Sequence, residues 1–222
     1  MREGNGRGEP DGFSADPVDV ALVLTMDASG SIAHDRLVFQ LEGHARAIES
    51  IRFVAAVEGG MLGRSAVTFF AWTGSDRQSL GVGWTVIDGA ASAHAFARAL
   101  RRATMPIPGY TSISGAIEYG VRLLANSGFE ATHRVIDICG NGINNDGRHV
   151  TAARDDAVAH GITINGLAIL DADPRLDAYF AEQVIGGSRA FVATARDLES
   201  FATSVLRKLL REVAAAAPDG QA

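Results

Sequence analysis

The sequence predicts an α/β protein with a doubly wound, mostly parallel six-stranded sheet, one antiparallel edge strand and helices on both faces. Apolar runs of strand length alternate with segments of helical periodicity along most of the chain. The run Val20–Leu24 is apolar without interruption, as in a strand that helices cover on both faces. Ser65–Trp72 and Ser79–Val86 are joined by a short, hairpin-like connection, which favours the antiparallel edge strand.

The individual elements are bounded by residues that start or stop them. The first strand begins at Val18, and a long helix over Ile32–Val57 is ended by the glycine pair after Glu58. Two prolines in Met105–Tyr110 indicate a loop. The other predicted elements alternate in type: strands at Arg134–Cys139, Thr163–Leu170 and Ala190–Ala193, and helices at Ser92–Arg102, Ser112–Ala125, Val150–His160, Asp173–Val184 and Asp197–Val213.

Length and composition bound the organisation of the chain. Its 222 residues are 47% hydrophobic and 21% charged, which is ordinary for a globular protein with a real core. We expect one domain over residues 18–213. Residues 1–17, rich in glycine and charge, are predicted to be a disordered arm, and residues 214–222 a tail.

The net charge of −6 argues against an electrostatic grip on nucleic acid or on an anionic membrane. No stretch reaches the roughly 18 apolar residues of a membrane helix, and the first residues lack the apolar core of a signal peptide. The expectation is a soluble protein, cytoplasmic as given, or periplasmic or secreted if a signal peptide was removed. A single cysteine excludes an internal disulfide.

A polar cluster follows the first strand directly. Asp27, Ser29 and Ser31 stand at alternate positions, and Gly30 between them permits a sharp turn. Ligands of open α/β sheets bind at the carboxyl ends of the strands, and three oxygen donors at this spacing suit Mg²⁺. In the simpler interpretation, the serines only cap the following helix or bond to the loop backbone.

This cluster matches the DxSxS signature of von Willebrand factor type A domains, also called integrin I-domains. That family builds a metal-ion-dependent adhesion site from DxSxS, a threonine in a later loop and an aspartate after the fourth strand. In the second loop, GYTSISGAI, Thr111 resembles the threonine. The segment VIDICGNG is similar to the third part of the motif, and Asn141 stands at the position of the aspartate.

Over residues 18–213, the sequence also resembles a bacterial subfamily of these domains that has no assigned function. The segments VDVALVL, WTVID, RVID, NNDG, ARDDAVAHGITINGLAIL and KLLRE carry it. Members of the subfamily have SGDG where this chain has CGNG, so Cys139 replaces a serine and Asn141 an acidic residue. Both departures fall in the predicted site.

The resemblance implies a module that binds another protein. It implies Mg²⁺, or Mn²⁺ or Ca²⁺, held by Asp27, Ser29, Ser31, Thr111 and Asn141. An acidic side chain of the partner would take a remaining coordination position. Because Asn141 brings no charge, the metal site is expected to be weakened, or even lost.

Enzyme motifs are absent from the sequence, so neither a catalytic residue nor an organic cofactor is predicted. No serine stands in a G-x-S-x-G nucleophile elbow, and GNGINN after Cys139 lacks the closing glycine of a dinucleotide loop. Two alternatives stay open: a metal-assisted hydrolase built on Asp27, and a metal-free structural or assembly component.

Other chemistry-bearing residues are interpreted as structural. Trp72 and Trp84 are expected to fill core or edge-strand packing, and Cys139 to be an inert core thiol. Asp137 is expected to face the structure rather than the metal. The polar run at residues 144–147 is interpreted as a turn whose side chains bond to their own backbone.

Overall fold

A computed structural model describes residues 15–30 and 32–214; the predicted arm up to residue 14, Ser31 and the tail beyond residue 214 lie outside this part of the chain. A six-stranded sheet has the order β3-β2-β1-β4-β5-β6, in which only β3 is antiparallel. The predicted fold class is therefore confirmed. The strands are β1 (Asp16–Asp27), β2 (Ser65–Trp72), β3 (Gln78–Ile87), β4 (Phe129–Gly140), β5 (Ile162–Ile169) and β6 (Val192–Ala195).

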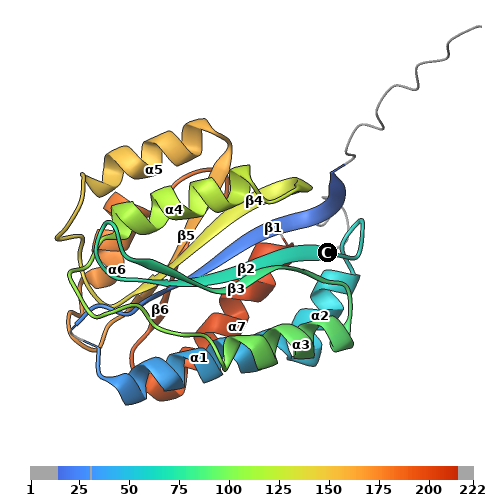
Figure 1. The fold of residues 1–222 in the computed structure, drawn as a ribbon, viewed down its shortest axis with the longest axis horizontal. Helices are drawn as coiled ribbons and strands as arrows, with labels where there is room; N and C mark the ends of the chain where they lie inside the picture. Colours follow the sequence, from blue (N-terminus) through green and yellow to red (C-terminus); the bar gives the residue numbers. More distant parts are fainter. Residues whose placement is uncertain (1–14, 31, 215–222) are drawn as a thin grey trace, which may run out of the picture.

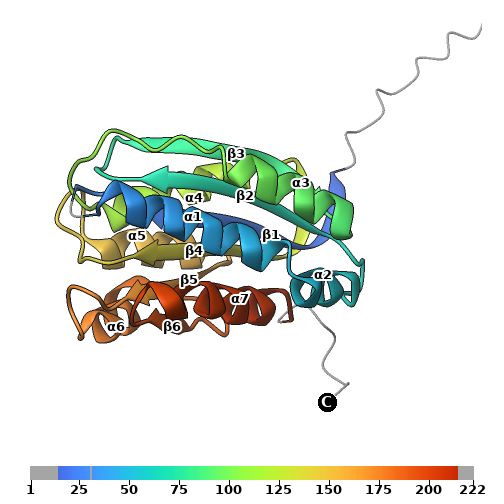
Figure 2. The same ribbon diagram turned by 90° about the horizontal axis from the view of Figure 1, so that it is seen from below.

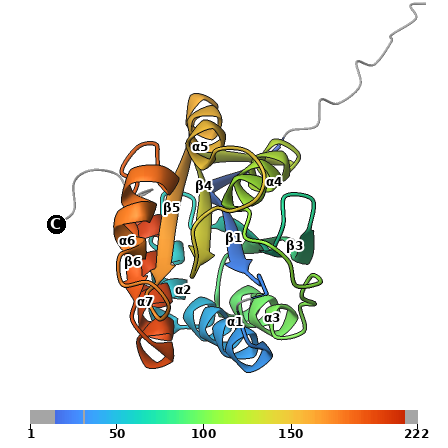
Figure 3. The same ribbon diagram turned by 90° about the vertical axis from the view of Figure 1, so that its left-hand side faces the viewer.

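Helices cover both faces of the sheet, as Figures 1 and 3 show. The first face carries α1 (His34–Ile48), α2 (Ile51–Glu58), α3 (Ala90–Leu100) and α7 (Leu198–Ala214). The second face carries α4 (Ile113–Ala125), α5 (Val150–Ala159), α6 (Leu176–Tyr179) and the π-helical turn η1 (Phe180–Val184). β1 is buried from Val18 to its end, and β2 along its whole length. This burial on both faces explains their unbroken apolar runs.

Three predicted helices differ from the observed ones. The segment predicted as one helix over Ile32–Val57 is two helices, because Ser50 adopts an extended backbone (φ −64°, ψ 134°) and caps α2 by accepting from Arg52 N–H. The segment predicted over Asp173–Val184 has only four α-helical residues before it passes into η1. Helix α3 begins before Ser92, with Gly89 at the N-cap position; Ser92 Oγ instead bonds to Asp88.

The parallel strands place their carboxyl ends at one edge of the sheet. Asp27 ends β1 opposite Trp72 at the end of β2, and Leu24 pairs with Asp137 of β4. The polar loops that follow β1 and β4 therefore start side by side. In the described part of the chain, no helix is both long enough and apolar enough to span a membrane.

A charged cluster lies buried between the sheet and α7. Lys208 Nζ is 2.5 Å from Asp137 Oδ1 and 2.5 Å from Glu212 Oε1, and all three side chains are at most 2% exposed. Asn165 of β5 donates to Glu212 Oε1 (3.0 Å). Burial raises the pKa of Asp137 and raises that of Glu212 to about 7. Burial alone would lower the pKa of Lys208, but the two carboxylates raise it overall.

Candidate metal-ion site

The site is built around the Asp27 carboxylate at the end of the central strand. This side chain is fully buried, and its Oδ1 accepts from the backbone N–H of Ser29 at 2.7 Å. Burial raises the pKa of Asp27 to about 6, although the backbone and side chain of Ser29, and more weakly the backbone N–H of Asn141, lower it in part. Its Oδ2 is buried and has no hydrogen-bond partner in the described part of the chain. A buried carboxylate oxygen without a donor is costly, and a bound cation is one group that could satisfy it.

The third loop lies against this carboxylate. A β-carbon added to Gly140 would be 3.5 Å from Asp27 Oδ2, an ordinary van der Waals contact, so the end of β4 lies directly against Asp27. The next residue, Asn141, has a side-chain Oδ1 that is also buried without a hydrogen-bond partner among the described residues. Two buried acceptor oxygens without donors thus lie at the carboxyl ends of two neighbouring strands, β1 and β4.

The second loop approaches from the β2 side of the sheet. Gly30 N–H donates to the Gly109 carbonyl at 3.0 Å, which ties the first loop to the second. A β-carbon added to Gly142 would lie 3.8 Å from Thr111 Oγ1, so Thr111, which is 7% exposed, borders the third loop. The three loops therefore converge on one spot at the edge of the sheet.

Side chains after Asn141 hold the loops together. Asn145 Oδ1 accepts from Thr111 N–H (2.8 Å), and Asn145 N–H donates to the Thr111 carbonyl (2.9 Å). Asp146 Oδ2 accepts from Ser75 N–H (2.7 Å), and Asn144 Oδ1 accepts from Ser114 N–H (3.0 Å). Their acceptor oxygens thus reach the neighbouring loops. Bonds within the run are also present, because the Asn144 amide donates to the Asp146 carbonyl (3.1 Å).

Of the five predicted metal-site residues, the structure brings Asp27, Ser29, Thr111 and Asn141 into one region. Ser31 lies outside the described residues. The role of all five as ligands stays a prediction. Residues 144–146 form hydrogen bonds that position Thr111 and its neighbours, whereas the sequence predicts only a turn there. Three consecutive hydrogen-bonding side chains close after the motif are the sequence signal for this role.

Three core residues next to the site have structural roles. Trp72 is fully buried, donates from Nε1 to Thr25 Oγ1 (3.0 Å) and accepts from Ala28 N–H through its carbonyl (2.8 Å). Cys139 is fully buried, and burial raises the pKa of its thiol, as expected for an unreactive cysteine. Asp137 points to Lys208 rather than to the site. These three structural interpretations agree with the geometry.

The donor set suits a hard divalent cation rather than a transition metal that prefers nitrogen or sulfur. The described residues contain no group of three or more His, Cys, Asp or Glu side chains that could hold a metal ion. The region instead offers one carboxylate, an amide oxygen and hydroxyl groups, which are ligands of Mg²⁺, Mn²⁺ and Ca²⁺. The two acceptors without donors fit such an ion.

Solved structures of von Willebrand factor type A domains share this fold. The chain is 12% identical to proximal thread matrix protein 1 of the mussel byssus with a zinc-occupied MIDAS motif, over 90% of this chain and 49% of that one (TM-score 0.61). It is 12% identical to the vWF domain of the pilus tip protein Mfa5 from Porphyromonas gingivalis, over 92% and 98% (TM-score 0.61). It is 16% identical to manganese-loaded Plasmodium vivax TRAP, over 86% and 73% (TM-score 0.54).

At these identities the likeness shows the fold alone, and the chain spans about half the length of the mussel matrix protein. No curated protein sequence matches it. The fold is that of von Willebrand factor type A domains, as the sequence motifs predict. The model of the family described as "Protein of unknown function (DUF1194)" matches residues 17–217, and the chain therefore belongs to that family.

Proposed function

We propose that this domain binds another protein through a divalent cation held at the carboxyl ends of β1 and β4. Asp27, Ser29, Ser31, Thr111 and Asn141 are the proposed ligand set, with Mg²⁺ or Mn²⁺ as the ion. The observation that carries the proposal is the pair of buried oxygens without donors, Asp27 Oδ2 and Asn141 Oδ1. Zinc or manganese in two proteins of the same fold supports the choice of a cation.

Exposed apolar side chains near the site support a protein partner. Ile107 is 75% exposed and Tyr110 72% exposed in the loop that carries Thr111, and Ile143 is 52% exposed in the loop that carries Asn141. Large apolar side chains that stand in solvent around a polar centre are typical of a protein-binding surface. In this arrangement, a carboxylate of the partner would complete the coordination of the ion while apolar contacts form around it. We name Ile107, Tyr110 and Ile143 the apolar rim.

A binding role rather than catalysis is favoured because the site has a single carboxylate. A metal-assisted hydrolase needs a base or nucleophile besides the ligands, and Asp137, the next acidic residue along β4, is engaged with Lys208. Pilus-tip and matrix proteins among the structures with this fold agree with a binding role.

Changing Asn141 to aspartate tests the ligand set. The change adds a negative charge next to the ion, and the net gain after desolvation and repulsion by Asp27 is about 1–2 kcal/mol, or near tenfold in metal affinity. Calorimetric titration with MgCl₂ and MnCl₂ measures it. Asn145→Asp is a poor control because Asn145 holds Thr111. The exposed Asn126 at the end of α4 provides a better one, and Asn126→Asp should leave the affinity unchanged. Equal behaviour of the two variants would contradict the assignment of Asn141.

The apolar rim provides the test of protein binding itself. Tyr110→Ser and Ile143→Ser should each reduce partner capture from a cell extract at least tenfold and leave the Mn²⁺ affinity unchanged, because neither side chain belongs to the ligand set. Capture should also require Mg²⁺ and be lost in EDTA. Ile51→Ser, at an 83% exposed position on α2, is the matched control. Capture that survives EDTA and both rim substitutions would mean that the domain uses another surface, without a cation.

A further inference from the structure

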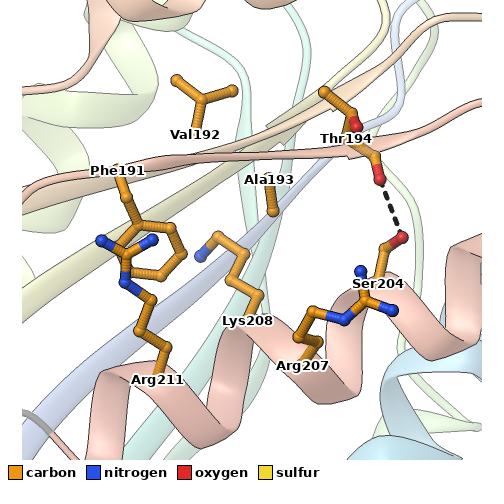
Figure 4. Close-up of a pocket in the computed structure, with 8 residues that line it drawn as sticks. All are labelled: Phe191, Val192, Ala193, Thr194, Ser204, Arg207, Lys208 and Arg211. Carbon is orange, nitrogen blue, oxygen red and sulfur yellow. Dashed lines mark hydrogen bonds between the residues drawn. The ribbon is translucent and has the colours of Figure 1, made fainter.

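A second polar cavity lies away from the candidate metal site, between the edge strand β6 and helix α7 (Figure 4). Its volume is about 250 Å³, and it shares no residue with the proposed ligand set. The lining residues are Phe191, Val192, Ala193, Thr194, Ser204, Arg207, Lys208 and Arg211. Three of these eight side chains are cationic, in a chain whose net charge is −6.

Two of the three cations are not neutralised by any residue that the structure describes. Lys208 is buried and neutralised by Asp137 and Glu212. Arg207 and Arg211 are exposed, and in the described part of the chain neither forms an ion pair. The positions three and four residues away from each on α7 carry no Asp or Glu. The cavity therefore has a local charge of about +2 from the arginines.

The placement of the two arginines is unfavourable without an anion. Arg207 and Arg211 are four residues apart, so they lie on the same face of α7, and like charges at this spacing destabilise a helix. Figure 4 shows the two guanidinium groups on either side of Lys208, and both arginine side chains line the cavity. A bound dianion would convert this repulsion into attraction.

Two contacts hold the side chains and elements of the cavity wall in place. The Arg211 guanidinium carbon stacks 3.9 Å from the centre of the Phe191 ring, which orients its N–H donors. Ser204 Oγ donates to the Thr194 carbonyl at 2.7 Å, so α7 is anchored to β6 at this point. In the described sheet no further strand pairs with β6, so β6 is the edge strand on this side.

We propose that this cavity binds a phosphate group, either as inorganic phosphate or as the end of a small phosphomonoester. The dianionic charge matches the two free arginines, and arginine forks are well suited to phosphate oxygens. A volume of about 250 Å³ corresponds to about eight waters at ~30 Å³ each, so it exceeds what phosphate alone fills. A small organic portion beside Val192 and Ala193 would occupy the remainder.

Thermal melting with sodium phosphate, with glycerol 3-phosphate and with sodium chloride at equal ionic strength tests the proposal. At about five times the dissociation constant, a bound phosphate should raise the melting temperature of the parent by about 2–4 °C over chloride. Tighter binding of glycerol 3-phosphate would identify the phosphomonoester as the ligand, and equal affinities would identify the anion itself. No increase over chloride with either compound would overturn the proposal.

Substitutions of the two arginines test whether phosphate binds in this cavity. Arg207→Gln, which disturbs no aromatic contact, should weaken phosphate binding at least fivefold, and the Arg207→Gln/Arg211→Gln double variant should abolish the increase. Arg98→Gln removes an equally exposed arginine from α3 and should bind as the parent does. The same loss in Arg98→Gln, or an unchanged increase in the double variant, would show an adventitious charge effect. Because these variants leave the metal-site loops intact, the outcome is independent of the proposed function.

Discussion

Replacing Lys208 by methionine is expected to reduce the free energy of unfolding by about 3–5 kcal/mol, the largest effect of any single change predicted for this protein. Methionine keeps the apolar stem but removes the cation that, among the described residues, neutralises Asp137 and Glu212 in their buried setting. Two buried carboxyl groups would then have to take up protons or unfold the contact between β4 and α7. Urea unfolding at pH 8 measures the loss.

Two measurements show whether Lys208→Met loses stability through unpaired charge or through packing: its dependence on pH, and a variant in which both carboxylates are also replaced. Because the folded pKa of Glu212 is raised from 4.5 to about 7, its contribution to stability is complete below pH 4.5 and is lost as the pH rises through 7. The Lys208→Met variant should therefore lose more at pH 8 than at pH 5. Adding Asp137→Asn and Glu212→Gln should restore most of the stability, since no buried charge remains. A triple variant as unstable as Lys208→Met would show that packing dominates.

Changing Asp27 to asparagine should stabilise the metal-free protein while it abolishes metal binding. The buried Asp27 carboxylate has its pKa raised from 3.8 to about 6, so at pH 8 its ionised form costs up to about 3 kcal/mol. Asparagine can still accept from Ser29 N–H, but its buried amide has no acceptor, which costs about 1–3 kcal/mol and leaves a net gain of about 0–2 kcal/mol. Mg²⁺ and Mn²⁺ should raise the melting temperature of the parent only.

The raised pKa of Asp27 makes the metal-free parent less stable as the pH rises. In the metal-free parent, the stability that Asp27 contributes is complete below pH 3.8 and falls as the pH rises through 6; the asparagine variant lacks this decline. Metal affinity of the parent should fall about tenfold per unit below pH 6, because the ion competes with a proton. Asp155→Asn, at an exposed position, is the control and should keep the response to metal. A melting temperature of Asp27→Asn that still rises with Mn²⁺ would place the ion elsewhere.

Strand and helix order could be predicted because burial on both faces leaves an unmistakable apolar run, as in β1 and β2. The break between α1 and α2 could not be predicted from such a pattern. The apolar positions of the two helices continue one periodicity, and only the backbone of Ser50 separates them. The short β6 also lay two residues away from its predicted place, since four residues carry little pattern.

For the candidate site, sequence spacing identified the loops because the carboxyl ends of parallel strands meet at one edge of a sheet. It could not identify contacts between residues far apart in the chain. The bond between Asn145 and Thr111 and the ion pair between Asp137 and Lys208 are of this kind. Lys208 and Glu212, four residues apart on the buried face of α7, are the local trace of the buried cluster in the sequence.

The course of the chain also determines how the domain would present its ligand. β1 begins at Asp16 on the side opposite the loop that follows Asp27, and α7 returns to that same side before Ala214 (Figure 2). Any segment joined to either end of the domain would therefore leave from the face opposite the site. Tethering to a surface or to a neighbouring domain would direct the three loops outward, and a partner could approach them without steric hindrance from the tether.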